Sequence, residues 1–217
     1  SYGDTYPIYS GAIGMTYEQG GGGASGLGVY KQEGDTLTLE DRIAHHYTTG
    51  ISTIEISSKN ADKLIKSFHK FFNDAVTTGT GSYKTYVIKN TPGATQNLNA
   101  LLDLLDKNGI QYSTGSGTAK GYNYFTRKDE TFTINKEDAV INVTQPQLTL
   151  ITVLFEPKTL LVDSATYDIT AWSLPYIYGV NGYAVKEKVN ITGPYSKPQK
   201  INNVTADTYG YVIPWEG

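Results

Sequence analysis

The sequence of 217 residues contains no cysteine and three histidines. Without cysteine, the chain can form neither a disulfide nor a thiolate zinc site. His45 and His46 are adjacent, so on a helix they would point about 100° apart and would not easily share a metal ion. His69 stands alone, and no H-E-x-x-H or H-x-x-E motif occurs. The histidines therefore predict no metal site of their own.

Long hydrophobic runs and clustered positive charge are also missing. No apolar run reaches the roughly 18 residues that a membrane helix needs. The 18 Lys and Arg residues are scattered, and the formal net charge is −3. Nucleic-acid binding requires a basic patch, so we expect no nucleic-acid partner. The G-x-S-x-G elbow of serine hydrolases is absent as well.

The first third of the chain predicts one strand and two helices. Residues 11–18, GAIGMTYE, form a short, Gly-flanked apolar run typical of a buried strand. A glycine-rich loop follows, and Thr38 and Asp41 then resemble a capping box. Apolar residues at helical spacing predict a helix over about 39–56. A second helix after Ser58 presents an apolar face spaced by three and four: Ala61, Leu64, Ile65, Phe68, Phe71 and Phe72.

The polar, Gly-containing residues 77–82 are the strongest domain boundary in the sequence. We therefore predict two domains, residues 1–78 and 83–217. Residues 83–89 and 110–114 are typical of strands, and residues 95–109 of an amphipathic helix that Gly109 ends in the left-handed conformation. This is a strand–helix–strand unit.

Further short strands are predicted at 121–126, 130–134 and 138–143. Residues 145–157 favour a short helix between two prolines, although their alternating pattern leaves a strand open. The predicted fold class is therefore α/β to α+β.

Glu18 precedes four glycines, and residues 21–26 also fit G-x-G-x-x-G. A dinucleotide-binding loop requires a helix directly after its last glycine, and the following LGVYKQEGD has no helical period. Phosphate binding is therefore disfavoured. A carboxylate at a strand end is commonly a capped or salt-bridged structural group, but beside a glycine loop it can also serve as a general base.

The segments Gly3–Pro7 and Gly11–Gln19 resemble the C-terminal part of a zinc carboxypeptidase domain. The group is the large secreted carboxypeptidases of Bacteroidota-type bacteria, and the resemblance covers about residues 1–76. It implies a strand whose final Glu18 is the catalytic general base. It also implies that LTLEDRIAHHYTTGISTIEI is the terminal helix, which packs on the sheet.

The resemblance implies a metal-assisted hydrolysis of C-terminal peptide bonds, with a peptide or protein as substrate. In the family, the zinc ligands are an H-x-x-E pair and a later His, all preceding the catalytic Glu. They have no match here, so we expect a C-terminal fragment of a secreted or periplasmic enzyme that binds no zinc alone. Its uncovered surfaces should lead either to self-association or to a rearrangement of the N-terminal segment. Weak substrate-binding candidates are Tyr6, Tyr17, Gly20 and Gly21.

The segments LFEP and YDITAWSLP resemble the region that follows the peptidase domain in the same proteins, which leads toward a glutamine-amidotransferase-like domain. We expect residues 83–217 to be an accessory α+β domain. Four aromatic residues could line a glycan or peptide groove by stacking, or could simply pack the core: Tyr167, Trp172, Tyr176 and Tyr178. A non-enzymatic binding module is therefore the alternative function.

Overall fold

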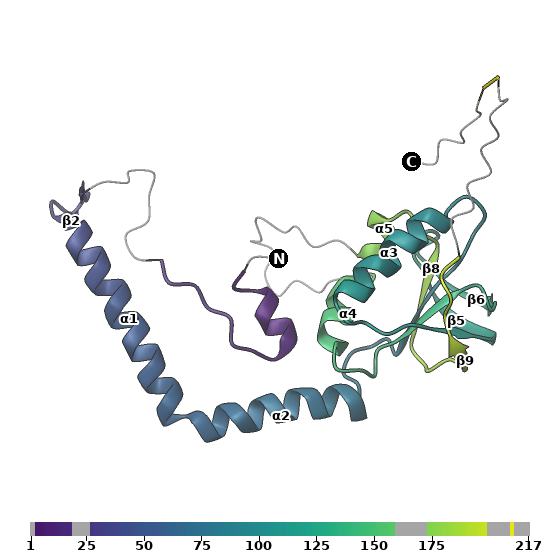
Figure 1. Cartoon of the computed structure of the whole chain (residues 1–217), viewed down its shortest axis with the longest axis horizontal. Helices are drawn as coiled ribbons and strands as arrows, with labels where there is room; N and C mark the ends of the chain where they lie inside the picture. The colour runs from purple at the N-terminus through teal and green to yellow at the C-terminus, as the bar shows by residue number, and fades with distance from the viewer. Residues whose placement is uncertain (1–2, 19–26, 159–172, 199–208, 211–217) are drawn as a thin grey trace. The chain divides into compact units, whose positions relative to one another are not determined.

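The computed structural model describes residues 3–18, 27–158, 173–198 and 209–210 (Figure 1). The chain divides at Asn73 into two compact units, which are called the N-terminal and the C-terminal unit below. The described residues contain five α-helices, a seven-stranded antiparallel sheet and a two-stranded hairpin. The expectation of a mixed α+β fold is thus confirmed.

The N-terminal unit is built from local elements. In chain order they are the 3-10 helix η1 (Tyr6–Ser10), the hairpin strands β1 (Gly28–Tyr30) and β2 (Thr36–Thr38), and the helices α1 (Leu39–Lys59) and α2 (Ala61–Thr77). The last residues of α2, from Asn73 on, belong to the C-terminal unit. The predicted capping box is present: the Thr38 hydroxyl accepts from the Asp41 N–H at 3.1 Å, and the Asp41 carboxylate accepts from the Thr38 N–H at 2.9 Å. The box fixes the start of α1 where the sequence predicted it.

The predicted strand at residues 11–18 is wrong. Gly11 adopts a left-handed φ of 77° and ends η1, and residues 12–18 form no strand. Most of their side chains are exposed. A strand needs a neighbouring strand to satisfy its backbone groups, and the described residues offer none beside this segment.

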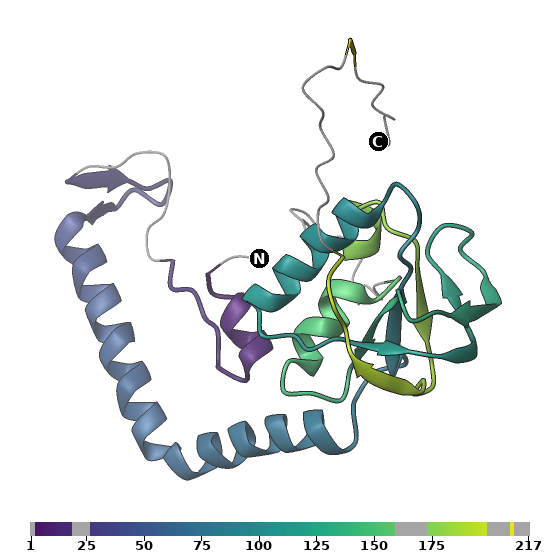
Figure 2. The same ribbon diagram turned by 45° about the vertical axis from the view of Figure 1, so that its right-hand side comes forward.

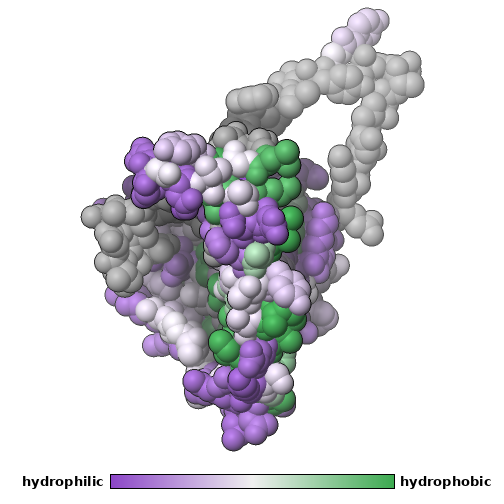
Figure 3. All heavy atoms as spheres, turned by 90° about the vertical axis from the view of Figure 1, so that its left-hand side faces the viewer, coloured by the Kyte–Doolittle hydropathy of each residue, from purple (hydrophilic) through white to green (hydrophobic). Residues whose placement is uncertain are grey.

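The longest helix of the N-terminal unit leaves its apolar residues uncovered. No residue of α1 is buried, although the helix has 21 residues. Figure 3 shows hydrophobic residues on the face of the molecule that carries α1. Five of them are spaced by three and four, and we call them the α1 stripe: Leu39, Ile43, Tyr47, Ile51 and Ile54.

The C-terminal unit carries the sheet and three helices (Figure 2). Its strands are β3 (Thr85–Ile88), β4 (Ser113–Gly115), β5 (Gly117–Asn123), β6 (Asp129–Ile134), β7 (Ala139–Asn142), β8 (Gly182–Val185) and β9 (Ile191–Pro194). Its helices are α3 (Thr95–Lys107), α4 (Leu148–Phe155) and α5 (Leu174–Ile177). The strand–helix–strand unit is confirmed as β3–α3–β4, and the ambiguous residues 145–157 form the helix α4.

The strands lie in the order β6-β5-β8-β3-β7-β4-β9. β4 and β5 are four positions apart in this order, which is about 19 Å in a flat sheet. Only Ser116 separates them in sequence, and two residue steps span at most ~7 Å. The sheet must therefore curl until β4 approaches β5. A Cβ on Gly115 would lie 3.0 Å from Val140 and 3.4 Å from Ile134 side-chain atoms, which shows how closely β4, β6 and β7 meet inside the curl.

The curled sheet buries apolar residues on both faces. The concave face encloses a cluster of six side chains: Val87, Phe132, Ile134, Val140, Tyr183 and Val185. The other face is covered by the helices, and α3 buries Leu98, Leu101, Leu102 and Leu105. After α3, the Gly109 N–H donates to the Asp106 carbonyl and the Ile110 N–H to the Leu105 carbonyl, both at 3.0 Å. With Gly109 at a φ of 65°, this is the left-handed helix end that the sequence predicted.

A buried ion pair joins three strands of the curl. The Lys89 ammonium, directly after β3, donates to the Asp138 carboxylate just before β7 and, at 2.8 Å, to the Thr133 carbonyl of β6. The Lys89 and Asp138 side chains are only 15% and 2% exposed. Asp138 also accepts the Asn135 N–H at 2.8 Å. The pair therefore provides hydrogen-bond partners for backbone groups at the end of β6.

Replacing Asp138 should destabilise the C-terminal unit strongly. Asp138→Asn leaves the Lys89 ammonium buried without a counter-charge, and such a loss typically costs about 3–5 kcal/mol. Urea unfolding followed by circular dichroism measures the change. Lys136→Met is the control, because the Lys136–Glu137 pair is 3.7 Å long and exposed. Equal unfolding midpoints for the two variants would contradict the role given to the pair.

A second ion pair ties the segment after β9 to α3. The Lys197 ammonium lies 2.5 Å from carboxylate oxygens of both Asp103 and Asp106. The hydrogen bond from Lys197 lowers the pKa of Asp106 below its ordinary 3.8. A lowered carboxylate pKa stabilises the fold above the unfolded-state value, and this contribution is lost as the pH falls through the folded-state pKa.

Lys197→Met should therefore lower the free energy of unfolding at neutral pH only modestly, by about 0.2–1 kcal/mol for an exposed pair. The difference from the parent protein should shrink as acid protonates Asp106. Urea titrations over a series of pH values test this, with Lys107→Met, on the helix that carries Asp103 and Asp106, as the control. A difference that persists unchanged in acid would show that the lysine acts through packing alone.

Candidate functional site

The segment that carries Glu18 is folded back on itself. The Asp4 carboxylate accepts hydrogen bonds from the Thr16 hydroxyl and, at 3.2 Å, from the Thr5 hydroxyl. The bond from Thr16 lowers the pKa of Asp4. Gly14 lies against the Asp4 carbonyl so closely that a Cβ at this position would be 1.7 Å from its oxygen. These contacts hold residues 4–16 as a closed loop, which we call the N-terminal clasp.

Two contacts continue from the clasp toward α1. The Tyr17 hydroxyl lies 2.7 Å from the Met15 sulfur and also shares a hydrogen bond with the Thr53 hydroxyl of α1. Thr53 in turn donates to the Thr49 carbonyl at 2.8 Å. Tyr17 therefore fixes the chain immediately before Glu18 on the helix.

Glu18 itself is exposed, and it lies at the end of the described part of the clasp region. This position differs from the expected one at the end of a buried strand. Of the substrate-binding candidates, Tyr6 and Tyr17 are 45% and 36% exposed. Gly20 and Gly21 lie outside the described residues.

The histidines and acids of the described residues do not assemble into a metal site. His45 and His46 are exposed on α1, and His69 is exposed on α2. Within the described ranges, no three His, Asp or Glu side chains are grouped to hold an ion.

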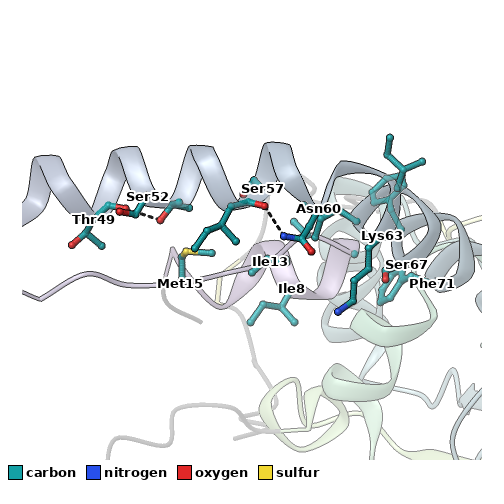
Figure 4. A pocket seen from close by; sticks show the side chains of 17 residues that line it. Ile8, Ile13, Met15, Thr49, Ser52, Ser57, Asn60, Lys63, Ser67 and Phe71 are labelled. Atoms are coloured by element: carbon teal, nitrogen blue, oxygen red, sulfur yellow. Dashed lines mark hydrogen bonds between the residues drawn. The ribbon is translucent and has the colours of Figure 1, made fainter.

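A groove runs between the clasp and the two helices of the N-terminal unit. Its volume is about 1210 Å³, and its walls are mainly apolar. Figure 4 shows Ile8, Ile13 and Met15 beside α1, with Lys63 and Phe71 coming from α2. Sequence reasoning missed this groove because it assigned residues 11–18 to a strand.

The aromatic candidates of the C-terminal unit are only partly described. Tyr176 is 40% exposed, and its ring lies edge-to-face on Tyr124 at 5.4 Å. Tyr178 is half-buried at the end of α5. Tyr167 and Trp172 lie outside the described residues. Among the described residues, the structure therefore shows no groove lined by these aromatic candidates.

Membrane-spanning helices and similarity to known proteins were also considered. No helix among the described residues is long and apolar enough to cross a membrane. Comparisons with models of protein families, with curated proteins and with solved structures gave no match.

Gly14→Ala should open the N-terminal clasp. The added methyl group would overlap the Asp4 carbonyl, and overpacking of this kind costs about 1–3 kcal/mol. Hydrogen exchange of the amides in residues 5–17 is expected to accelerate in this variant. Gly3→Ala is the matched control, since its added Cβ would meet no atom within 4 Å. Identical exchange in both variants would show that Gly14 is not a point of close contact.

Proposed function

We propose that this chain contributes the C-terminal part of the catalytic domain of a zinc-dependent carboxypeptidase, followed by an accessory α+β domain. The proposal rests on the resemblance of residues 3–7 and 11–19 to that family. In it, Glu18 takes a proton from the attacking water and delivers it to the leaving amine. The substrate is a peptide or protein with a free C-terminus, and the location is secreted or periplasmic.

The observation that best supports the proposal is that no described residue of the N-terminal unit is buried. Its longest helix buries no residue, and the α1 stripe is 43–69% exposed. Apolar surface of this extent usually marks an interface or an uncovered core. A unit completed by further polypeptide, as the resemblance implies, would cover it.

The arrangement around Glu18 is compatible with a proton-transfer role. The clasp and the Tyr17–Thr53 contact hold the chain up to the residue before Glu18. Glu18 itself is exposed and accessible to a substrate that other polypeptide positions. A general base needs this combination of fixed backbone and access to water. The remainder of the site, including the ligands of any zinc ion, would come from outside the described residues.

The competing proposal is a non-enzymatic module that binds peptide or glycan. It is favoured by the exposed aromatic side chains of the C-terminal unit, among them Tyr176 at 40% and Phe125 at 63%. Such a module would depend on these aromatics and would be indifferent to Glu18. Single substitutions therefore distinguish the two proposals.

The decisive variant is Glu18→Gln in the protein extended by its upstream coding sequence. We expect the hydrolysis of a C-terminal peptide bond to fall by about 10²–10⁴-fold, the usual contribution of a general base. Glu33→Gln, in an exposed turn of the same unit, is the control and should retain full activity. Unfolding midpoints should be equal in both variants.

The upstream coding sequence tests the proposal before any variant is made. It should encode an H-x-x-E pair and a separate His before Glu18, because the resemblance requires these ligands. Turnover that survives Glu18→Gln, or an upstream sequence without the ligands, would refute the catalytic role. Loss of ligand binding in Tyr176→Ala would then favour the binding module.

A further inference from the structure

A slot opens in the sheet of the C-terminal unit, between β5 and the loop that joins β8 to β9. Its volume is about 670 Å³, within the range of ~300–1,000 Å³ that is usual for ligand pockets. One wall is β5 from Gly117 to Gly121, and the other is the loop from Lys186 to Asn190.

The slot exists because the pairing of β5 with β8 covers only the C-terminal part of β5. β5 begins at Gly117, but its paired residues start with Gly121, which lies opposite Val185. The two walls meet again where the Ser116 N–H donates to the Asn190 carbonyl at 3.2 Å. Between these two contacts, β5 is paired with β6 on one side and borders the slot on the other.

The backbone of β5 directs hydrogen-bonding groups into the slot. In an antiparallel sheet, the N–H and carbonyl groups of successive residues point to alternate neighbours. The Tyr124 N–H donates to the Gly182 carbonyl of β8 at 3.2 Å, so every second residue back along β5 points to the same side. Thr118 and Lys120 belong to this series. Their N–H groups have no acceptor among the described residues, and such an unpaired edge is a template for another strand.

The floor of the slot is apolar and has little side-chain bulk. Ala119 packs against the cluster on the concave face, and Gly117 and Gly121 lie on the same face of β5. A Cβ on Gly117 would meet no atom within 4 Å, so the space beside it is open. Three apolar side chains also line the slot: Ile134, Val185 and Val189. An apolar side chain of a ligand would therefore be buried here.

Positive charge predominates at the rim. Three lysines and two acids line the slot, and all five are exposed: Lys120, Lys186, Lys188, Asp129 and Glu187. Within the described part of the chain, none of the three ammonium groups takes part in an ion pair. Because Lys120 follows Ala119 along the strand, its side chain lies on the face opposite the floor. A strand added beside β5 would meet the apolar floor on one face and Lys120 on the other.

We propose that this slot binds an extended peptide in which acidic and apolar residues alternate. The peptide would add a strand to β5 and accept hydrogen bonds from the Thr118 and Lys120 N–H groups. In an antiparallel arrangement, the residues opposite Thr118 and Lys120 share their face, so the acidic side chains would lie near the lysines. The apolar side chains would lie over Ala119.

A small anion such as citrate matches the slot less well. It would pair with the lysines, but it would leave the apolar floor uncovered. The proposal does not depend on the carboxypeptidase function, because every residue that lines the slot belongs to the C-terminal unit.

Isothermal titration of the 217-residue chain tests the ligand class. The probe is the acetylated and amidated pentapeptide EVEVE, for which we expect saturable binding. Two matched peptides should bind about tenfold more weakly: KVKVK, which reverses the charge, and EVEVE with N-methylated glutamates, which keeps the charge but blocks strand pairing. No binding of EVEVE, or equal binding of either matched peptide or of citrate, would overturn the assignment.

Residue-resolved hydrogen exchange tests the geometry. In the free chain, the amides of Thr118 and Lys120 should exchange rapidly, and saturating EVEVE should slow their exchange. The amides of Gly117 and Ala119 point to β6 and are the internal control. If Thr118 and Lys120 were as protected as Ala119 in the free chain, the slot would be closed and the proposal refuted.

Two variants test the residues of the slot. Thr118→Pro removes a donor that pairs with nothing in the described structure, so it should weaken EVEVE binding about tenfold and leave the ladder with β6 intact. Thr118→Val keeps the N–H and should bind like the parent chain. Lys188→Glu changes an exposed residue, so its fold should be unaffected, and it should weaken EVEVE binding while strengthening that of KVKVK. Lys107→Glu, on α3 and outside the slot, is the control for charge reversal.

Unchanged EVEVE binding in Lys188→Glu, or in a folded Thr118→Pro variant, would refute the proposal. Neither result bears on the hydrolysis assay for Glu18, so the two proposals fail independently.

Discussion

The architecture of the C-terminal unit depends on the one-residue connection between β4 and β5. Ser116 joins strands that are second from opposite edges of the sheet, so the sheet cannot remain flat. The resulting curl creates the concave core around Phe132 and Tyr183, whose rings stack at 3.7 Å. It also brings the ends of β3, β6 and β7 together, where Lys89 and Asp138 satisfy backbone groups that a flat sheet would leave at its edge.

The N-terminal unit is organised by different forces. Its described residues are held by a capping box, helical hydrogen bonds and the side-chain contacts of the clasp, while its apolar stripe remains exposed. Short-range interactions of this kind define local shape but contribute little to global stability, because burial of apolar surface is the dominant favourable term. The catalytic role proposed for Glu18 would therefore depend on groups beyond the described residues of this unit.

The proposal for Glu18 draws on two kinds of observation. The role of Glu18 rests on a resemblance in sequence and on the uncovered surface around α1.

The sequence by itself determined the elements whose signals are local. Helical spacing and the Thr38–Asp41 box placed α1, and Gly109 placed the end of α3, because caps and left-handed turns depend on a few neighbouring residues. Tertiary structure alone decided whether residues 11–18 have a partner strand, how far the sheet curls, and which side chains pack against the buried Tyr86. These outcomes depend on contacts between distant segments, such as Tyr86 with Phe155, and periodicity carries no information about such pairs.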